Sequence, residues 1–189
     1  MDIVTRAKNI TLSPNSEWPV IAAEPATVGT LYNGYIAVLA AIGPVCSLLG
    51  LMFFFGGAGI GAGFLATIVT YAINLGAVYV VAQIAQWLAP KFGGHADSVA
   101  ALKLVAYSYT PAWIGGVFAL IPALGIVTLL LALYGFYVLY AGATPVVNVP
   151  KERAVTFTAT LVIAVIVVFA VTSAVVGAIV GAGMVGTMG

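Results

Sequence analysis

Residues 154–180 read AVTFTATLVIAVIVVFAVTSAVVGAIV and contain no charged side chain. A helix needs about 20 predominantly apolar residues to cross the hydrocarbon core of a bilayer. This stretch alone therefore predicts a transmembrane helix. The whole chain has a similar character, because 63% of its residues are hydrophobic and only 6% are charged, whereas charged residues make up roughly a quarter of a soluble domain. The sequence thus predicts an all-α membrane protein.

The number of spans follows from the positions of the charges. The six Lys and Arg and the five Asp and Glu residues fall into three clusters, at 2–24, 91–103 and 151–153. At about 20 residues per span, each uncharged interval between clusters holds two spans, and the interval after the third cluster holds one. We therefore expect a bundle of five transmembrane helices. Their expected positions are about 31–55, 63–88, 98–120, 122–141 and 155–180.

The same charges predict the orientation. Two spans between clusters return the chain to the side on which it started, so all six Lys and Arg residues share one face. Lys and Arg in short loops remain cytoplasmic. We therefore expect a multi-pass protein of the bacterial cytoplasmic (inner) membrane, with its amino terminus inside and its carboxyl terminus outside. The chain divides into a cytosolic juxtamembrane segment (1–30), the membrane domain (31–183) and a loose tail (184–189).

The juxtamembrane segment has helical signals. Apolar residues recur at helical spacing from Ile3 to Ile10, opposite Arg6 and Lys8, which predicts a short amphipathic helix on the membrane surface. The pair Ser13–Pro14 is typical of a helix start and predicts a second short helix. We expect Trp18 of that helix at headgroup depth, where aromatic rings anchor membrane proteins.

Residues suited to catalysis or metal binding are few. Cys46 and His95 are the single cysteine and the single histidine, so a cysteine or histidine metal cluster is missing. Asp97 and Ser98 lie beside His95, but neighbours on one loop rarely converge as a catalytic triad. The glycines of 56–63 lack the Lys-Ser/Thr of a phosphate-binding loop. We expect no enzymatic activity, no cofactor, no metal and, with a net charge of +1, no nucleic-acid partner.

Polar residues inside the expected second span allow two interpretations. Asn74 lies near mid-membrane, and Gln83 lies further along the same helix. They could line a substrate path, or they could form interhelical hydrogen bonds, which contribute roughly 0.6 kcal/mol each. We favour the packing interpretation, because no ionisable residue accompanies them, whereas ion-coupled pumps place such residues inside the membrane.

Small residues recur every four positions in two places, at Ser173, Gly177 and Gly181 in the last span and at Gly59 and Gly63 before the second. This spacing lets helix backbones approach closely. We expect packing within the bundle, with a homo-oligomer formed through the same face as the alternative.

Several segments of the chain combine into one pattern. They are 6–14 (RAKNITLSP), 17–25 (EWPVIAAEP), 101–113 (ALKLVAYSYTPAW), 120–125 (LIPALG), 133–135 (LYG) and 150–153 (PKER). In this order they resemble the bacterial branch of the Yip (Ypt/Rab-interacting protein) domain family. The resemblance implies a five-span helical domain with a cytosolic amino terminus. It links the eukaryotic relatives to Rab-type GTPases and vesicle traffic, although their acidic-Leu-x-Gly-Pro signature is reduced here to Glu24–Pro25.

These observations favour a non-enzymatic integral membrane protein that binds protein or lipid partners and organises the membrane. The expected partners are membrane lipids, a membrane or cytosolic protein, or a second copy of the chain. The alternative is a passive pathway for neutral solutes or lipids, lined by Asn74, Gln83 and Tyr107. The residues expected to contact partners or headgroups are Glu17, Trp18, Tyr107, Tyr109, Trp113, Lys151 and Arg153.

Overall fold

The structure is a computed structural model that describes residues 2–55 and 60–186. In these two ranges the chain is helical and forms no strand, as predicted. Four helices there are long and apolar enough to cross a membrane. They are Val28–Phe54, Gly63–Phe92, Gly125–Val147 and Lys151–Ile179.

Three of these four segments contain one long helix each, namely α6 (Ile60–Leu88), α9 (Gly125–Val147) and α10 (Lys151–Gly186). The α9 helix runs through Pro145 and extends beyond the expected end at 141, so that only 148–150 connect it to α10. The other segment is assembled from short pieces. These are α3 (Val28–Leu31), a π-helical turn (Tyr32–Ile36), α4 (Ala37–Ala40) and α5 (Ile42–Phe55).

The expected span at 98–120 is not one continuous helix. It consists of α7 (Ser98–Ser108), α8 (Thr110–Gly115) and a 3-10 turn (Gly116–Leu120). Pro111 lacks a backbone N–H, which interrupts the helical hydrogen-bond ladder. Ser108 adds to the break, because its hydroxyl donates to the Leu104 carbonyl at 2.7 Å, a bond that bends helices.

The connections at one end of the bundle lie together. The backbone N–H of His95 donates to the Val147 carbonyl at 2.9 Å, and the Asn148 side chain donates to the His95 carbonyl at 3.3 Å. The charged cluster at 91–103 and the one at 151–153 therefore share an end, which we call the charged end.

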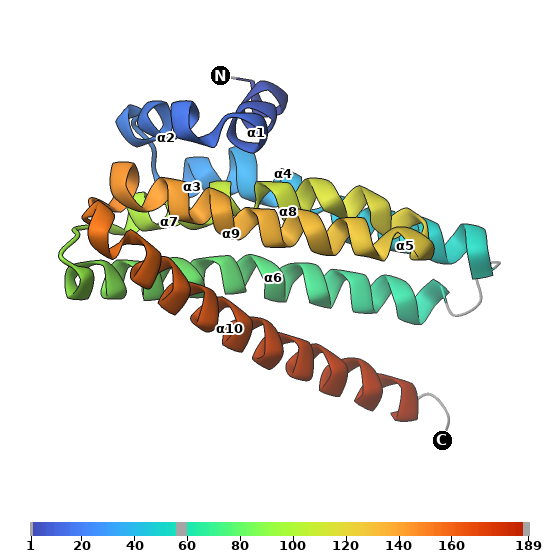
Figure 1. Ribbon diagram of the computed structural model, residues 1–189. Coiled ribbons are helices and arrows are strands. Elements are labelled where there is room, and N and C mark those ends of the chain that lie inside the picture. The colour runs from blue at the N-terminus through green and yellow to red at the C-terminus, as the bar shows by residue number, and fades with distance from the viewer. Residues whose placement is uncertain (1, 56–59, 187–189) are drawn as a thin grey trace.

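Side-chain burial differs between the two halves of the bundle. The half next to the charged end holds fully buried residues such as Ala101, Val138 and Leu161. The other half exposes large apolar side chains such as Phe53 and Leu130, as expected where lipid is the solvent. Figure 1 shows the cause in part, because α10 starts beside the other helices and diverges from them towards the carboxyl terminus.

Candidate functional site

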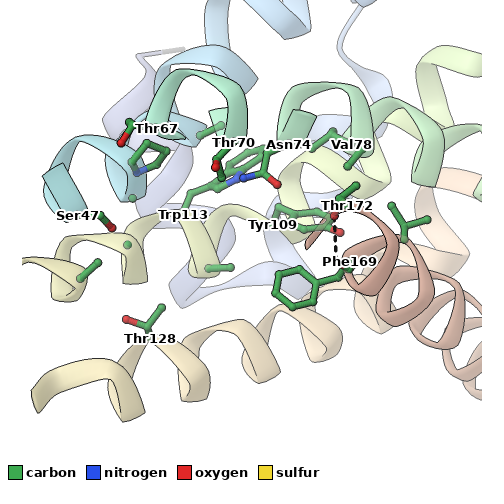
Figure 2. Close-up of a pocket in the computed structure, with 18 of the residues that line it drawn as sticks. Ser47, Thr67, Thr70, Asn74, Val78, Tyr109, Trp113, Thr128, Phe169 and Thr172 are labelled. Carbon is green, nitrogen blue, oxygen red and sulfur yellow. Dashed lines mark hydrogen bonds between the residues drawn. The ribbon is translucent and has the colours of Figure 1, made fainter. Parts of the chain in front are cut away.

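A large cavity lies in the half of the bundle away from the charged end. It has a volume of about 660 Å³, within the range of roughly 300–1,000 Å³ typical of ligand pockets. Five helical segments line it: α4–α5, α6, α8 with its 3-10 extension, α9 and α10 (Figure 2). Its polar side chains are Ser47, Thr67, Thr70, Asn74, Tyr109, Trp113, Thr128 and Thr172. We call this cavity the polar chamber.

Three threonines of the polar chamber donate their hydroxyl hydrogens to backbone carbonyls. Thr67 donates to Gly63 at 2.8 Å and Thr172 to Phe169 at 3.0 Å, each within its own helix. Thr128 donates to Gly115 at 2.9 Å and so joins α9 to α8. A hydroxyl that has given its hydrogen away still has lone pairs. These three residues therefore offer hydrogen-bond acceptors to a bound molecule.

Asn74 and Tyr109 can supply hydrogen-bond donors. The Asn74 side chain is exposed on α6 and points into the polar chamber (Figure 2). Its amide makes no hydrogen bond to another residue within 2–55 and 60–186, and Tyr109 likewise makes no such bond through its hydroxyl. The Tyr109 ring stacks on Trp113 with a centroid distance of 5.9 Å. A primary amide in hydrocarbon needs a partner, so the polar chamber is suited to a molecule with hydroxyl or carbonyl groups.

A second cavity of about 350 Å³ adjoins the first. Tyr109, Ala112 and Phe169 line both cavities. The remaining walls are apolar apart from Ser108, whose hydroxyl is used within α7. They consist of Val81, Val105, Leu129, Ala132, Gly135, Phe136, Leu139, Val165 and Ile166. We call this cavity the apolar chamber.

The chambers end at the core of the charged half. Ala82, Val138 and Leu161 are completely buried there. Gln83 does not continue the polar lining, because it borders a surface groove with Tyr79 and Trp87, and its side-chain nitrogen is buried without a described partner. The structure therefore does not bring Asn74 and Gln83 together along one path.

Tyr107 is also remote from such a path. It is a buried core residue, whose ring lies 4.4 Å from Tyr35 and 6.2 Å from Trp18. The expectation that Tyr107 is accessible to partners or solutes is therefore wrong. Tyr109 and Trp113, by contrast, line the polar chamber, and Lys151 and Arg153 are exposed at the start of α10.

The juxtamembrane helices α1 (Ile3–Leu12) and α2 (Pro14–Ala23) pack on the bundle (Figure 1). Trp18 has no exposed surface, and its indole N–H donates to the Val138 carbonyl of α9 at 2.9 Å. The ring fills the space beside Gly142, where a Cβ atom would lie 2.6 Å from it. Trp18 therefore packs against α9 and is not presented to lipid headgroups, since the notch at Gly142 gives the ring a buried site.

The buried face of α1 also carries a charge. Arg6 is 3% exposed and pairs with Glu17 and Glu24 of the α2 segment, and Glu17 is itself only 6% exposed. Asn9 donates to the other Glu17 oxygen at 3.2 Å. The expectation of Arg6 and Glu17 on an accessible surface is therefore wrong, because each compensates the other's charge, which makes burial tolerable.

Lys103 completes this arrangement from α7. Its ammonium group donates to the carbonyls of Ile21, at 2.8 Å, and Glu24. These carbonyls belong to the carboxyl-terminal end of α2, where a cation interacts favourably with the helix dipole. Lys103 therefore ties the juxtamembrane helices to the bundle.

The small residues differ in their surroundings. A Cβ atom at Gly63 would lie 2.8 Å from the Leu51 side chain of α5, whereas one at Gly177 would meet nothing within 4 Å. Ser173 is exposed on the same helix. Gly181 lies in α10, and Gly59 lies outside the described residues. The close approach thus occurs at Gly63, and the described part of the chain places no helix against Gly177.

Comparison with known proteins places this architecture in a family. The profile of the Yip1 domain matches residues 8–173, which is most of the chain. The chain belongs to the Yip1 domain family. The resemblance read from the sequence is thereby confirmed, and the matched Yip1 region contains α2 and every residue that lines the two chambers.

The Yip1 relatives include a bacterial membrane protein. The chain is 27% identical over 165 residues to inner membrane protein YohC of Escherichia coli strain K12, a match that covers 81% of this chain and 85% of the relative. YohC of the O6:H1 strain matches equally. No solved structure matches the chain significantly. The relatives and the apolar helices identify a multi-pass membrane protein.

Proposed function

We propose that this Yip1 protein is a non-enzymatic membrane protein that binds a lipid molecule inside its helical bundle. The observation that carries the proposal is the polar chamber, a cavity of about 660 Å³ with hydroxyl and amide groups in a half of the bundle whose outer surface is apolar. Hydrogen-bonding groups in such surroundings are satisfied best by an amphiphile that enters from the bilayer.

The proposal includes five crossings, with α7, α8 and their 3-10 extension together forming the third. The amino terminus and the charged end are cytosolic, and the carboxyl terminus is external. Two contacts support this topology. The loop at 93–97 binds the end of α9 and Asn148 through His95, and Lys103 binds α2. The charged clusters therefore gather at one end, which the preference of Lys and Arg for the cytoplasm makes the inner one.

The packing of the half next to the charged end favours binding of a lipid over its passage across the membrane. A pathway across the membrane would need polar lining along its whole length, whereas the chambers stop at a core in which Ala82, Val138 and Leu161 have no exposed surface. We therefore expect the flux of neutral solutes or lipids in proteoliposomes to stay at the level of protein-free liposomes.

The test is retention of lipid by the purified protein. Native mass spectrometry should detect a bound lipid in the unmodified protein, and Thr70→Phe, which places a ring in the polar chamber, should abolish its retention. Asn74→Leu should weaken retention, because it removes the amide that a lipid oxygen would bind. Asn33→Leu is the matched control, since Asn33 is exposed outside both chambers. A lipid signal that neither chamber variant changes, or flux that depends on Asn74, would refute the proposal.

A further inference from the structure

The two chambers follow each other along the bundle axis in the same order on each helix that lines both of them. On α6 the polar chamber is lined by Thr70 and Asn74, and the apolar chamber by Val81, which is closer to the charged end. On α10, which starts at the charged end, Thr172 lines the polar chamber and Val165 the apolar one. The polar chamber therefore lies farther from the charged end than the apolar chamber does, and the proposed topology places it towards the external surface.

The boundary between the chambers is formed by Tyr109, Ala112 and Phe169. Tyr109 occupies this place because it sits at the break between α7 and α8. Ala112 lines both chambers with only a methyl group, which fills less space than a larger side chain would. An elongated molecule can thus extend from one chamber into the other beside Ala112.

The polar chamber has hydrogen-bonding groups but no charge. None of its lining residues within the described ranges is Lys, Arg, Asp or Glu. A phosphate group placed there would lose its hydration without gaining a cation, which is costly in hydrocarbon. Hydroxyl and ester groups suit the lining, because Asn74 and Tyr109 can donate to the oxygens of both. The hydroxyl oxygens of Thr67, Thr128 and Thr172 can in turn accept from a hydroxyl group of the bound molecule.

From this order we propose that the site selects an uncharged glycerolipid of the outer leaflet. Its glycerol and ester groups occupy the polar chamber, and one acyl chain passes Tyr109 and Phe169 into the apolar chamber. This inference rests on the proposed function and adds to it the charge of the headgroup, the direction of the lipid and the position of its chain.

The headgroup is tested with two probes that share glycerol and a palmitoyl chain. Palmitoyl monoacylglycerol is uncharged, and palmitoyl lysophosphatidic acid differs from it by a phosphate. In competition experiments in nanodiscs, the uncharged probe should bind at least about tenfold more tightly. If the phosphate-bearing probe binds equally or better, and Thr70→Phe abolishes its binding, the inference on charge fails while the lipid site remains. If neither probe binds, the proposed function fails as well.

The direction of the lipid is tested by the fluorescence of Trp113, which lines the polar chamber alone. Monoacylglycerol brominated near its ester should quench this indole more strongly than the same lipid brominated at the chain end. The Trp113 contribution is the difference between the unmodified protein and Trp113→Phe. Stronger quenching by bromines at the chain end would mean that the lipid lies in the opposite direction, and it would overturn the inference.

The chain position is tested by filling the apolar chamber. Ala132→Phe should reduce binding of the palmitoyl probe about tenfold and spare a decanoyl probe, because the added ring shortens the space for a chain. Ala170→Phe on the exposed face of α10 is the matched control. Equal effects of Ala132→Phe on both chain lengths would refute this placement of the chain. If that variant does not fold, the bromine comparison in the unmodified protein still decides.

Discussion

Gly142→Ala tests whether the juxtamembrane helices dock on the bundle. The new methyl group would lie 2.6 Å and 2.7 Å from two carbons of the Trp18 ring and 2.7 Å from Leu104 Cδ1. Carbon atoms pack at about 3.5–4.0 Å, so the ring has to move by roughly 1 Å. That movement strains the indole hydrogen bond to the Val138 carbonyl, which is only 2.9 Å long.

The magnitude follows from three contributions. Overpacking costs about 1–3 kcal/mol, and weakening the hydrogen bond costs about 0.5–1.5 kcal/mol. Replacing glycine by alanine within a helix returns up to about 1 kcal/mol. We therefore expect Gly142→Ala to lower the free energy of unfolding by about 0.5–4.5 kcal/mol.

The assay is thermal unfolding in detergent, where each kcal/mol corresponds to about 2–4 °C for a chain of this size. Gly76→Ala in α6 is the matched control, because a Cβ atom there meets nothing within 4 Å, and its Tm should stay unchanged or rise. In the Trp18→Phe background the cost of Gly142→Ala should shrink, since the two sites are in contact. If Gly142→Ala is as stable as the unmodified protein, with the same helix content, α2 does not dock on α9 as described.

Three further predictions concern other parts of the chain. Arg6→Gln should lower the free energy of unfolding by about 3 kcal/mol, because it leaves Glu17 buried without its partner; thermal unfolding measures this, and an unchanged Tm would contradict the buried pair. Gly177→Leu should leave the Tm of the monomer unchanged, since a side chain there meets open space, and loss of a dimer in light scattering would instead assign this face to contact between copies. A topology reporter fused at Gly93 should read cytosolic and one at Gly189 external, and a cytosolic signal at Gly189 would exclude five crossings.

The sequence by itself determined the class of the protein. The all-helical membrane character and the family were both predicted correctly, and the positions of α6, α9 and α10 differ from expectation mainly at their ends. These properties follow from the length of each apolar run and from the local order of residues. Each can be evaluated one segment at a time, without knowledge of which segments touch.

Only the tertiary structure decided where the polar residues point. Trp18 and Arg6 are residue types that membrane-surface helices often expose, yet both are buried here. The Trp18 ring packs in the notch at Gly142, and Arg6 pairs with the carboxylates of Glu17 and Glu24. The polar chamber was likewise not evident as a site, although Asn74, Tyr109 and Trp113 were each singled out. Its walls come from five helical segments that are far apart in the chain. A cavity exists only where packed helices fail to fill the space between them, and that depends on their mutual arrangement rather than on any one segment.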